Sequence, residues 1–221
     1  MNCLTFISGW DTVTLGFGGL IIGCLAGLLG IGGGILMVPL MVSLGLPPVQ
    51  GVATSTVAML LISISGSWQN WRMGQLKFQK VISLGFPSLL TAQVGVYWLQ
   101  YIPSYVLMSC FIVLLLASIY LIQLRRKLSQ QEDVSQFQTP AWISNLGRIF
   151  TGSASGLLAG LFGISGGVIM VPLQIILLGE PMGIAAPTSL GVVVISASSA
   201  FMGHAVTGNV LYSVGILLGI T

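Results

Sequence analysis

Charged residues are scarce in this 221-residue chain. Seven residues are basic and four are acidic, so 5% of the chain is charged, whereas a soluble globular domain carries about 25%. With 55% hydrophobic residues, the chain has too little polar surface to solvate a folded domain in water. This scarcity excludes a soluble enzyme and a disordered regulator, and a net charge of +3 provides no nucleic-acid-binding patch. The chain therefore belongs in a lipid bilayer.

Residues that carry catalytic or metal chemistry are also few. Cys3, Cys24 and Cys110 share no metal-binding spacing, and His204 is the single histidine. The predicted spans contain no carboxylate, and no nucleotide-binding loop, HExxH motif or pair of acids occurs. We therefore expect no catalytic residue, no metal site and no cofactor. The absence of carboxylates from the spans disfavours a cation transporter and suits an anion better.

What the chain does contain is long apolar sequence. Residues 12–71, 81–124, 149–179 and 181–221 include no Asp, Glu, Lys or Arg. Because a helix needs roughly 20 residues to cross about 30 Å of hydrocarbon, these runs predict about seven transmembrane helices. The fold class is therefore an all-α integral membrane protein. The predicted helices cover residues 13–44, 50–70, 81–101, 104–124, 146–178, 184–205 and 209–221.

Basic residues gather in two polar segments, residues 72–80 and 125–145. Two predicted crossings separate these segments, so both lie on the same side of the membrane. The positive-inside rule makes that side cytoplasmic. The sequence therefore predicts a multi-pass protein of the cell membrane with both segments in the cytoplasm.

One stretch of the chain occurs twice. Residues 26–40 read AGLLGIGGGILMVPL and residues 159–173 read AGLFGISGGVIMVPL, with eleven identities in fifteen positions. After a one-residue insertion the register continues, so that Gly74 falls opposite Gly208, 134 residues further on. A spacing held over so many residues indicates a duplicated unit.

The duplication divides the chain into parts. We expect an N-terminal four-helix repeat over residues 1–124, a cytoplasmic linker over 125–145, and a C-terminal repeat over 146–221. The last repeat has three predicted helices and looks incomplete, because no eighth helix follows to match the one over 104–124. Either the sequence stops before that helix or the protein lacks it. Duplicated halves are common in secondary transporters, which bind substrate near the membrane midplane. Four full crossings per unit would give parallel halves, whereas a re-entrant hairpin would give inverted halves. The sequence leaves both open and slightly favours the parallel arrangement.

The helices predicted over 13–44 and 146–178 are too long for one crossing and carry a glycine cluster in the middle. Glycine in a helix costs about 1 kcal/mol relative to alanine, and backbone released from a helix cannot face lipid. We therefore expect a break that lines a cavity, where the N–H groups of a new half-helix attract an anion. Close helix packing through small residues is the alternative. The expected cavity-lining residues are Gly32, Gly33, Gly34, Ser165, Gly166 and Gly167, with Gly30, Pro39, Gly163 and Pro172 as structural breaks.

Polar side chains recur at matching places in the two copies. Thr54 and Ser55 in the first copy correspond to Thr188 and Ser189 in the second. Their hydroxyls can donate to an oxyanion, or they can bond a backbone carbonyl one turn back.

Two further polar residues also correspond. Asn70 falls opposite His204, whose imidazole could hold a proton, donate to an anion, or lie at the membrane interface. We predict that six polar residues bind the substrate or flank its path: Thr54, Ser55, Asn70, Thr188, Ser189 and His204.

These segments resemble the sulfite exporter TauE/SafE family. The resemblance rests on AGLLGIGGGILMVPL with the VATSTVAM that follows it, on the second copies AGLFGISGGVIMVPL and PTSLGV, and on NWRMGQ and GHAVTGN. It implies two four-helix repeats, usually with eight spans, and transport of sulfite, thiosulfate or an organosulfonate across a bacterial inner membrane. This chain departs from that pattern by ending in its seventh predicted helix and by having Ser165 in the second glycine cluster.

The expected partners are a small anionic substrate, the lipid bilayer and a coupling ion, either H⁺ or Na⁺. Neither the oligomeric state nor the direction of transport follows from the residues. The alternative function is a membrane complex subunit or assembly factor without a transport path of its own.

Overall fold

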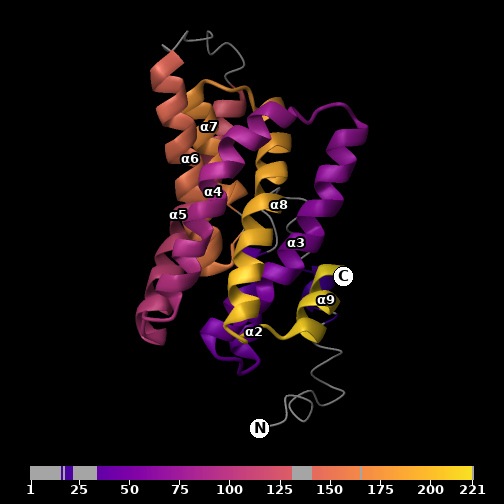
Figure 1. The fold of residues 1–221 in the computed structure, drawn as a ribbon, viewed down its shortest axis with the longest axis vertical. Helices are drawn as coiled ribbons and strands as arrows, with labels where there is room; N and C mark the ends of the chain where they lie inside the picture. The colour runs from indigo at the N-terminus through magenta and orange to yellow at the C-terminus, as the bar shows by residue number, and fades with distance from the viewer. Residues whose placement is uncertain (1–15, 17, 22–33, 131–140, 165, 221) are drawn as a thin grey trace.

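A computed structural model describes residues 16, 18–21, 34–130, 141–164 and 166–220, and the structural statements below concern this part of the chain (Figure 1). The described part is helical and contains no strand, which confirms the predicted all-α class. The helices are α2 (Gly34–Ser43), α3 (Pro48–Arg72), α4 (Phe78–Leu99), α5 (Ser104–Gln130), α6 (Ala141–Phe162), α7 (Gly167–Leu178), α8 (Met182–Val206) and α9 (Tyr212–Ile220).

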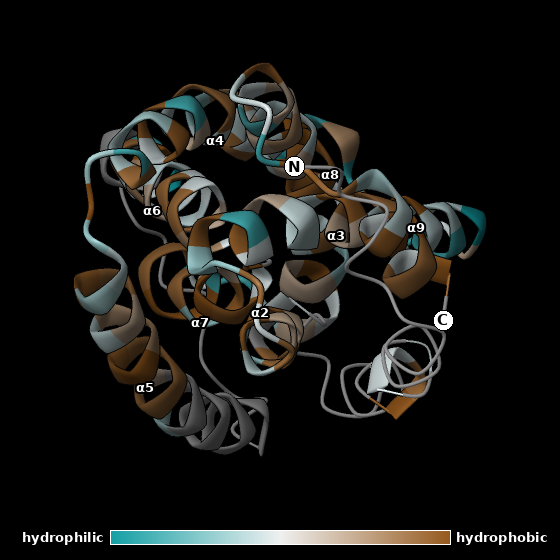
Figure 2. Cartoon of the chain, turned by 90° about the horizontal axis from the view of Figure 1, so that it is seen from below, coloured by the Kyte–Doolittle hydropathy of each residue, from teal (hydrophilic) through white to brown (hydrophobic). Residues whose placement is uncertain are grey.

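Three of the described helices, α3, α4 and α8, are long and apolar enough to cross a bilayer. The apolar helix α7 and the apolar Ser104–Ala117 part of α5 are shorter. Hydrophobic residues also cover outward faces of the bundle (Figure 2), and Phe86 on α4 and Val113 on α5 are 67% and 66% exposed. An apolar surface of this kind needs lipid or another protein to cover it. The total of seven spans stays a prediction.

Helices α3 and α8 begin and end in the same way. Each starts directly after a proline, and each ends two residues before a glycine in the left-handed conformation, Gly74 (φ 69°) or Gly208 (φ 72°). After α3, the N–H of Gln75 donates to the carbonyl of Asn70 at 3.0 Å. This hydrogen bond closes the helix end as a glycine C-cap does.

The polar segment 125–145, predicted as a linker, is helical at both of its ends. Helix α5 continues to Gln130, and α6 begins at Ala141. The reason is local, because residues 124–130 (LRRKLSQ) are mostly strong helix formers. The remaining part of the linker, 131–140, lies outside the described residues.

Helices α4 and α6 pack with their backbones in close contact. Gly152, Gly156 and Gly160 recur every four residues on α6 and face, in the same order, backbone carbonyls of α4 between Leu84 and Ala92. A Cβ at any of the three would collide with those carbonyls, so the approach requires glycine. Because the contacts advance in the same order, α4 and α6 run parallel.

Helix α7 folds back along α6 instead of continuing it. The start of α7 lies where Gly166 faces Ser155, and its end lies where Leu178 faces Gly147, nearer the start of α6. The two helices therefore form an antiparallel hairpin. The segment predicted over 146–178 thus reverses direction at its glycine cluster.

Helices at matching places in the two sequence copies run in opposite directions. Gly66 of α3 faces Leu190 of α8, while Met59 packs in one cluster with Ala197, so α3 and α8 are antiparallel. The parallel arrangement favoured by the sequence is therefore wrong for these helices. The hairpin of α6 and α7 explains the opposite directions. The chain reverses once more than the prediction of a single span over 146–178 allows, so α8 runs opposite to the predicted direction.

Helices α4 and α9, which occupy matching places in the two copies, each pack on the other copy. Gly215 of α9 faces Val57 of α3, and Val81 of α4 faces Gly191 of α8. The two contacts match by position in the copies. The same 134 positions that separate the sequence copies separate residue 57 from 191 and residue 81 from 215. The contact between α3 and α9 thus has a counterpart between α8 and α4.

Replacing Gly156 by alanine tests the close contact of α4 and α6. The new Cβ would collide with the carbonyl of Ser88 and the hydroxyl of Thr91, and overpacking of this kind costs about 1–3 kcal/mol. We expect Gly156→Ala to lower the melting temperature in detergent. Gly183→Ala is the control, since no atom lies within 4 Å of its added Cβ. Equal melting temperatures for the two variants would contradict the packing described here.

Candidate functional site

The second glycine cluster forms the junction between α6 and α7, and we call residues 163–167 the glycine junction. Helix α6 ends at Phe162, and α7 begins at Gly167. Gly163 has φ 58°, a left-handed conformation in which a side chain would be strained. The carbonyls at the end of α6 and the N–H groups at the start of α7 thus lack the partners that a continuous helix supplies.

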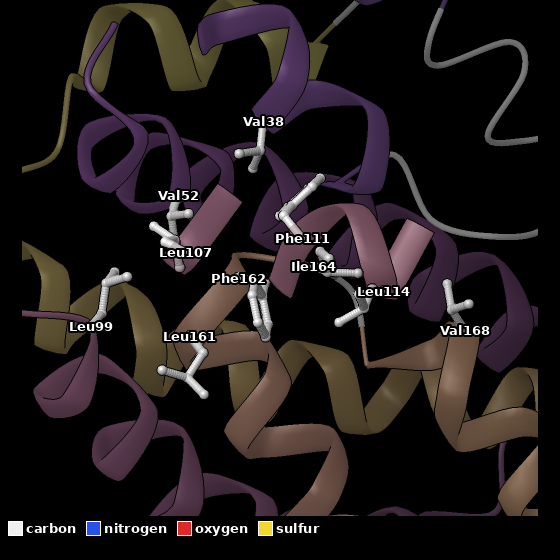
Figure 3. Packing of buried hydrophobic residues seen from close by; sticks show 10 residues of the cluster. All are labelled: Val38, Val52, Leu99, Leu107, Phe111, Leu114, Leu161, Phe162, Ile164 and Val168. Carbon is white, nitrogen blue, oxygen red and sulfur yellow. The ribbon is translucent and has the colours of Figure 1, made fainter. Parts of the chain in front are cut away.

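The described start of α2 lies against the glycine junction. A Cβ added to Gly34 would lie 2.7 Å from the carbonyl oxygen of Gly163 and 3.2 Å from the Cα of Ile164. One turn further along α2, Val38 shares a buried apolar cluster with Phe162 and Ile164 (Figure 3). Residues 30, 32 and 33 of the first glycine cluster lie outside the described part of the chain, as does Ser165.

Helix α7 is about half as long as a membrane span. It contains 12 residues, which corresponds to about 18 Å, against about 30 Å of hydrocarbon. The described part of α2, Gly34–Ser43, and α7 both start near the glycine junction and run toward opposite ends of the molecule (Figure 1).

Side chains from other helices bind the carbonyls released at the end of α6. The Ser55 hydroxyl on α3 is 3.0 Å from the oxygen of Gly163 and 2.8 Å from that of Val52, and it donates its hydrogen to these carbonyls. Nε2 of His204 on α8 lies 3.2 Å from the oxygen of Gly160. A carbonyl only accepts, so Nε2 must carry the hydrogen. Ser55 and His204 thus stabilise the end of α6.

The other predicted hydroxyls differ in their contacts. Thr54 Oγ1 accepts a hydrogen bond from the N–H of Leu211 at 3.2 Å, directly before α9. Ser189 Oγ donates to the carbonyl of Ala186 at 2.8 Å, one turn back in the same helix. Thr188 is buried, and its hydroxyl has no partner in the described part of the chain. Of the four hydroxyls, Thr188 is the one left without a protein partner.

Other predicted residues lie apart from the junction or have a different role. Because α3 and α8 are antiparallel, Asn70 near the end of α3 and His204 near the end of α8 lie at opposite ends of the molecule. Pro39 and Pro172, predicted as breaks, lie inside α2 and α7. A proline has a φ that suits a helix and removes only its own N–H donor, so each helix continues through its proline.

Ser155 is a polar residue at the junction that the sequence did not indicate. It is buried on α6, and a Cβ on Gly166 would collide with its hydroxyl. Its counterpart in the first copy is Ile22, so the duplication gives no signal for it. The one sequence feature that could have indicated Ser155 is Thr151, another small polar residue one turn earlier.

The charged side chains described by the structure lie far from the junction. Lys80 Nζ and Glu180 Oε1 form an ion pair at 2.7 Å, which joins the start of α4 to the turn between α7 and α8. Figure 1 shows this turn, the turn between α3 and α4, and the start of α6 at the same end of the molecule. The basic segment 72–80 thus lies at that end as well.

Surface grooves lie elsewhere. One of about 500 Å³ is lined by Tyr97, Trp98 and Tyr101, and one of about 280 Å³ by residues that include Gln93 and Met202. Both lie toward the C-terminal end of α4, and neither includes the glycine junction. Gly163 and Ser55 are buried, so the junction is closed to solvent at these positions.

Apolar spanning helices around a half-length helix that starts in the interior are typical of membrane transport proteins. The chain belongs to the sulfite exporter TauE/SafE family, whose sequence profile matches residues 15–221. It is therefore a membrane transporter of that family.

Individual relatives agree with this class. The chain is 25% identical over 223 residues to the probable membrane transporter protein YunE of Bacillus subtilis, covering 91% of this chain and 81% of the relative. It is 28% identical over 210 residues to a probable membrane transporter protein of Methanocaldococcus jannaschii, covering 89% and 74%. A shorter match, 31% identical over 104 residues, covers 47% of this chain and 22% of sulfite exporter TauE/SafE family protein 3 of Arabidopsis thaliana. No solved structure matches the chain.

The Gly163→Ala variant tests the geometry of the junction. Its Cβ would be strained by the positive φ and would collide with the Ser55 hydroxyl and the Val52 carbonyl. Gly179→Ala is the matched control, because Gly179 has φ 62° but no atom within 4 Å of an added Cβ. Both variants bear the left-handed strain of about 1–2 kcal/mol, and Gly163→Ala bears the collision in addition. Thermal unfolding in detergent should rank Gly163→Ala clearly below Gly179→Ala; the reverse order would contradict the assigned contacts.

Two substitutions of His204 test its role as a cap of α6. His204→Ala leaves the Gly160 carbonyl unpaired, which costs about 1–3 kcal/mol, whereas the amide of His204→Gln can still donate. We expect the alanine variant to melt at a lower temperature and the glutamine variant to recover most of the loss. If the alanine variant is as stable as the wild type, the hydrogen bond to Gly160 does not cap the helix.

Proposed function

We propose that this protein is a secondary transporter that moves a small sulfur-containing anion, such as sulfite, thiosulfate or an organosulfonate, across the bacterial inner membrane. The observation that carries the proposal is the contact between Gly34, the first described residue of α2, and the glycine junction from which α7 starts. The family membership supports this substrate class, and the name of one relative includes the words sulfite exporter.

The electrostatics of the junction favour an anion. A helix N-terminus acts as roughly half a positive charge, so two of them can offset about one unit of negative charge. No carboxylate of the described residues lies at the junction, and the one described acid, Glu180, is paired with Lys80. Unpaired N–H groups inside a membrane also need acceptors, and the oxygens of an oxyanion supply them.

The proposed binding site contains the main chain of residues 32–34 and 165–167. In this arrangement Thr54, Ser55, Ser189 and His204 hold the surrounding helices in position, and Asn70 flanks the path at the basic end.

The two halves are proposed to act as inverted repeats. The opposite directions of α3 and α8, and the matched contacts of α4 and α9, support this arrangement. Rocking of one half against the other would then open the junction to each side in turn. The basic segments 72–80 and 125–145 are proposed to face the cytoplasm, as the positive-inside rule requires, and H⁺ or Na⁺ is the proposed coupling ion.

Transport by purified protein in liposomes tests the proposal. We expect wild-type protein to accelerate the flux of at least one of ³⁵S-labelled sulfite, thiosulfate and ethanesulfonate above that of empty liposomes. Gly167→Asp should abolish that flux, because its carboxylate would occupy the start of α7, where an added Cβ meets only the Ser189 hydroxyl at 3.6 Å.

The matched control for this variant is Gly179→Asp, which adds the same charge at an exposed turn. It should transport as the wild type does. Absence of flux for all three anions would overturn the proposed function, and full flux in Gly167→Asp would overturn the proposed site.

A further inference from the structure

Four polar side chains in the interior of the second half have no hydrogen-bonding partner among the described residues. They are fully buried and come from three helices: Thr151 and Ser155 from α6, Gln174 from α7, and Thr188 from α8. Both polar atoms of the Gln174 amide are unpaired. A buried polar group without a partner costs about 1–3 kcal/mol, so this concentration requires an occupant that supplies hydrogen bonds.

Gln174 and Thr188 lie on neighbouring helices, between the start of α7 and the turn that joins α7 to α8. Gly167 at the start of α7 faces the hydroxyl of Ser189 on α8, and the N–H of Glu180 in the turn donates to the carbonyl of Gln174. Because α7 and α8 run antiparallel, Thr188, next to Ser189, lies nearer the start of α7, and Gln174 lies nearer the turn. The two side chains thus occupy successive levels between the glycine junction and the turn.

The hairpin of α6 and α7 places Thr151 beside the same part of α7. Ser155 lies at the start of α7, beside Gly166, and the far end of α7 packs on Gly147. Thr151 falls between these two contacts, one turn from Ser155. The unpaired groups therefore extend from the glycine junction along α7 toward the basic end of the molecule.

The Lys80–Glu180 ion pair lies at the end of this line of polar groups. The N–H of Glu180 donates to the carbonyl of Gln174 at 3.3 Å, so the two residues are close. Glu180 is buried, with Oε1 bound to Lys80 and Oε2 without a partner in the described part of the chain. Polar groups thus run from the junction to the one described ion pair.

We propose that Thr151, Gln174 and Thr188 form a second binding station for a small oxyanion, between the glycine junction and the Lys80–Glu180 pair. The inference rests on the proposed function, because it names side chains on the route of the same transported anion. The Gln174 amide offers two N–H donors and each threonine offers one O–H donor, which suits the several oxygens of a sulfur oxyanion. The positive end of α7 lies on the junction side of the station, and on the other side the ammonium of Lys80 is paired with the carboxylate of Glu180.

Isosteric variants test the station. Gln174→Met, Thr151→Val and Thr188→Val each remove donors with little change in volume. Thr56→Val is the matched control, since its buried hydroxyl already has the carbonyl of Ala53 as partner at 2.6 Å.

Each variant of the station should raise the half-saturating concentration of thiosulfate in the liposome flux assay about tenfold, as expected for a lost hydrogen bond to an anion, and Thr56→Val should not. The two threonine variants decide the matter if Gln174→Met does not fold.

Gln174→Glu tests the sign of the charge that is bound. A carboxylate in place of the amide repels an anion, so we expect this variant to lose thiosulfate flux. Gln69→Glu is its control, because it adds the same charge at an exposed position near the same end of the molecule.

The outcomes separate this inference from the proposed function. Wild-type flux together with unchanged flux in all variants of the station overturns the station alone. Flux that is retained by Gln174→Glu and becomes dependent on Na⁺ also overturns it, because the groups would then bind a cation. Absence of flux of sulfite, thiosulfate and ethanesulfonate in the wild type overturns both proposals.

Discussion

The need to satisfy every backbone polar group inside a membrane governs the structure around the glycine junction. A helix that ends within the bilayer leaves carbonyls and N–H groups that lipid cannot bind. At the end of α6, the hydroxyl of Ser55 and the imidazole of His204 bind the free carbonyls. At the start of α7, no side chain caps the helix. The acceptors of the break are thus paired internally, and in the proposed site the uncapped donors bind the anion.

The contacts of the junction also join the two halves of the chain. Ser55 belongs to the first sequence copy, and the Gly163 carbonyl that it binds belongs to the second. In addition, α9 of the second copy packs on α3 of the first, and α4 of the first copy packs on α8 of the second. A movement of one half against the other must therefore change the surroundings of the junction. This coupling is the physical basis for an alternating-access cycle in the proposed transporter.

The sequence predicted the helix ends better than the direction of the helices. The duplicated glycines 74 and 208 end α3 and α8, and residues 163–167 separate α6 from α7, because glycine conformation is a local property. Whether the chain reverses at such a cluster depends on which surface the next helix packs against, which periodicity does not reveal. Ser155 and Gln174 were missed for another reason. Their counterparts in the first copy are apolar, so a search for duplicated polar residues cannot find them.

The central claim is that the start of α7 faces a site that attracts anions within the membrane. Cysteine modification at Gly167 tests it most directly, in a variant whose native cysteines are replaced by serine. The rate with a methanethiosulfonate reagent that carries a sulfonate is compared with that of one that carries a trimethylammonium group, and the ratio is normalised to Gly179→Cys at an exposed turn. The account predicts that the negative reagent is favoured at position 167. A normalised preference for the positive reagent, or no reaction with either, would contradict it.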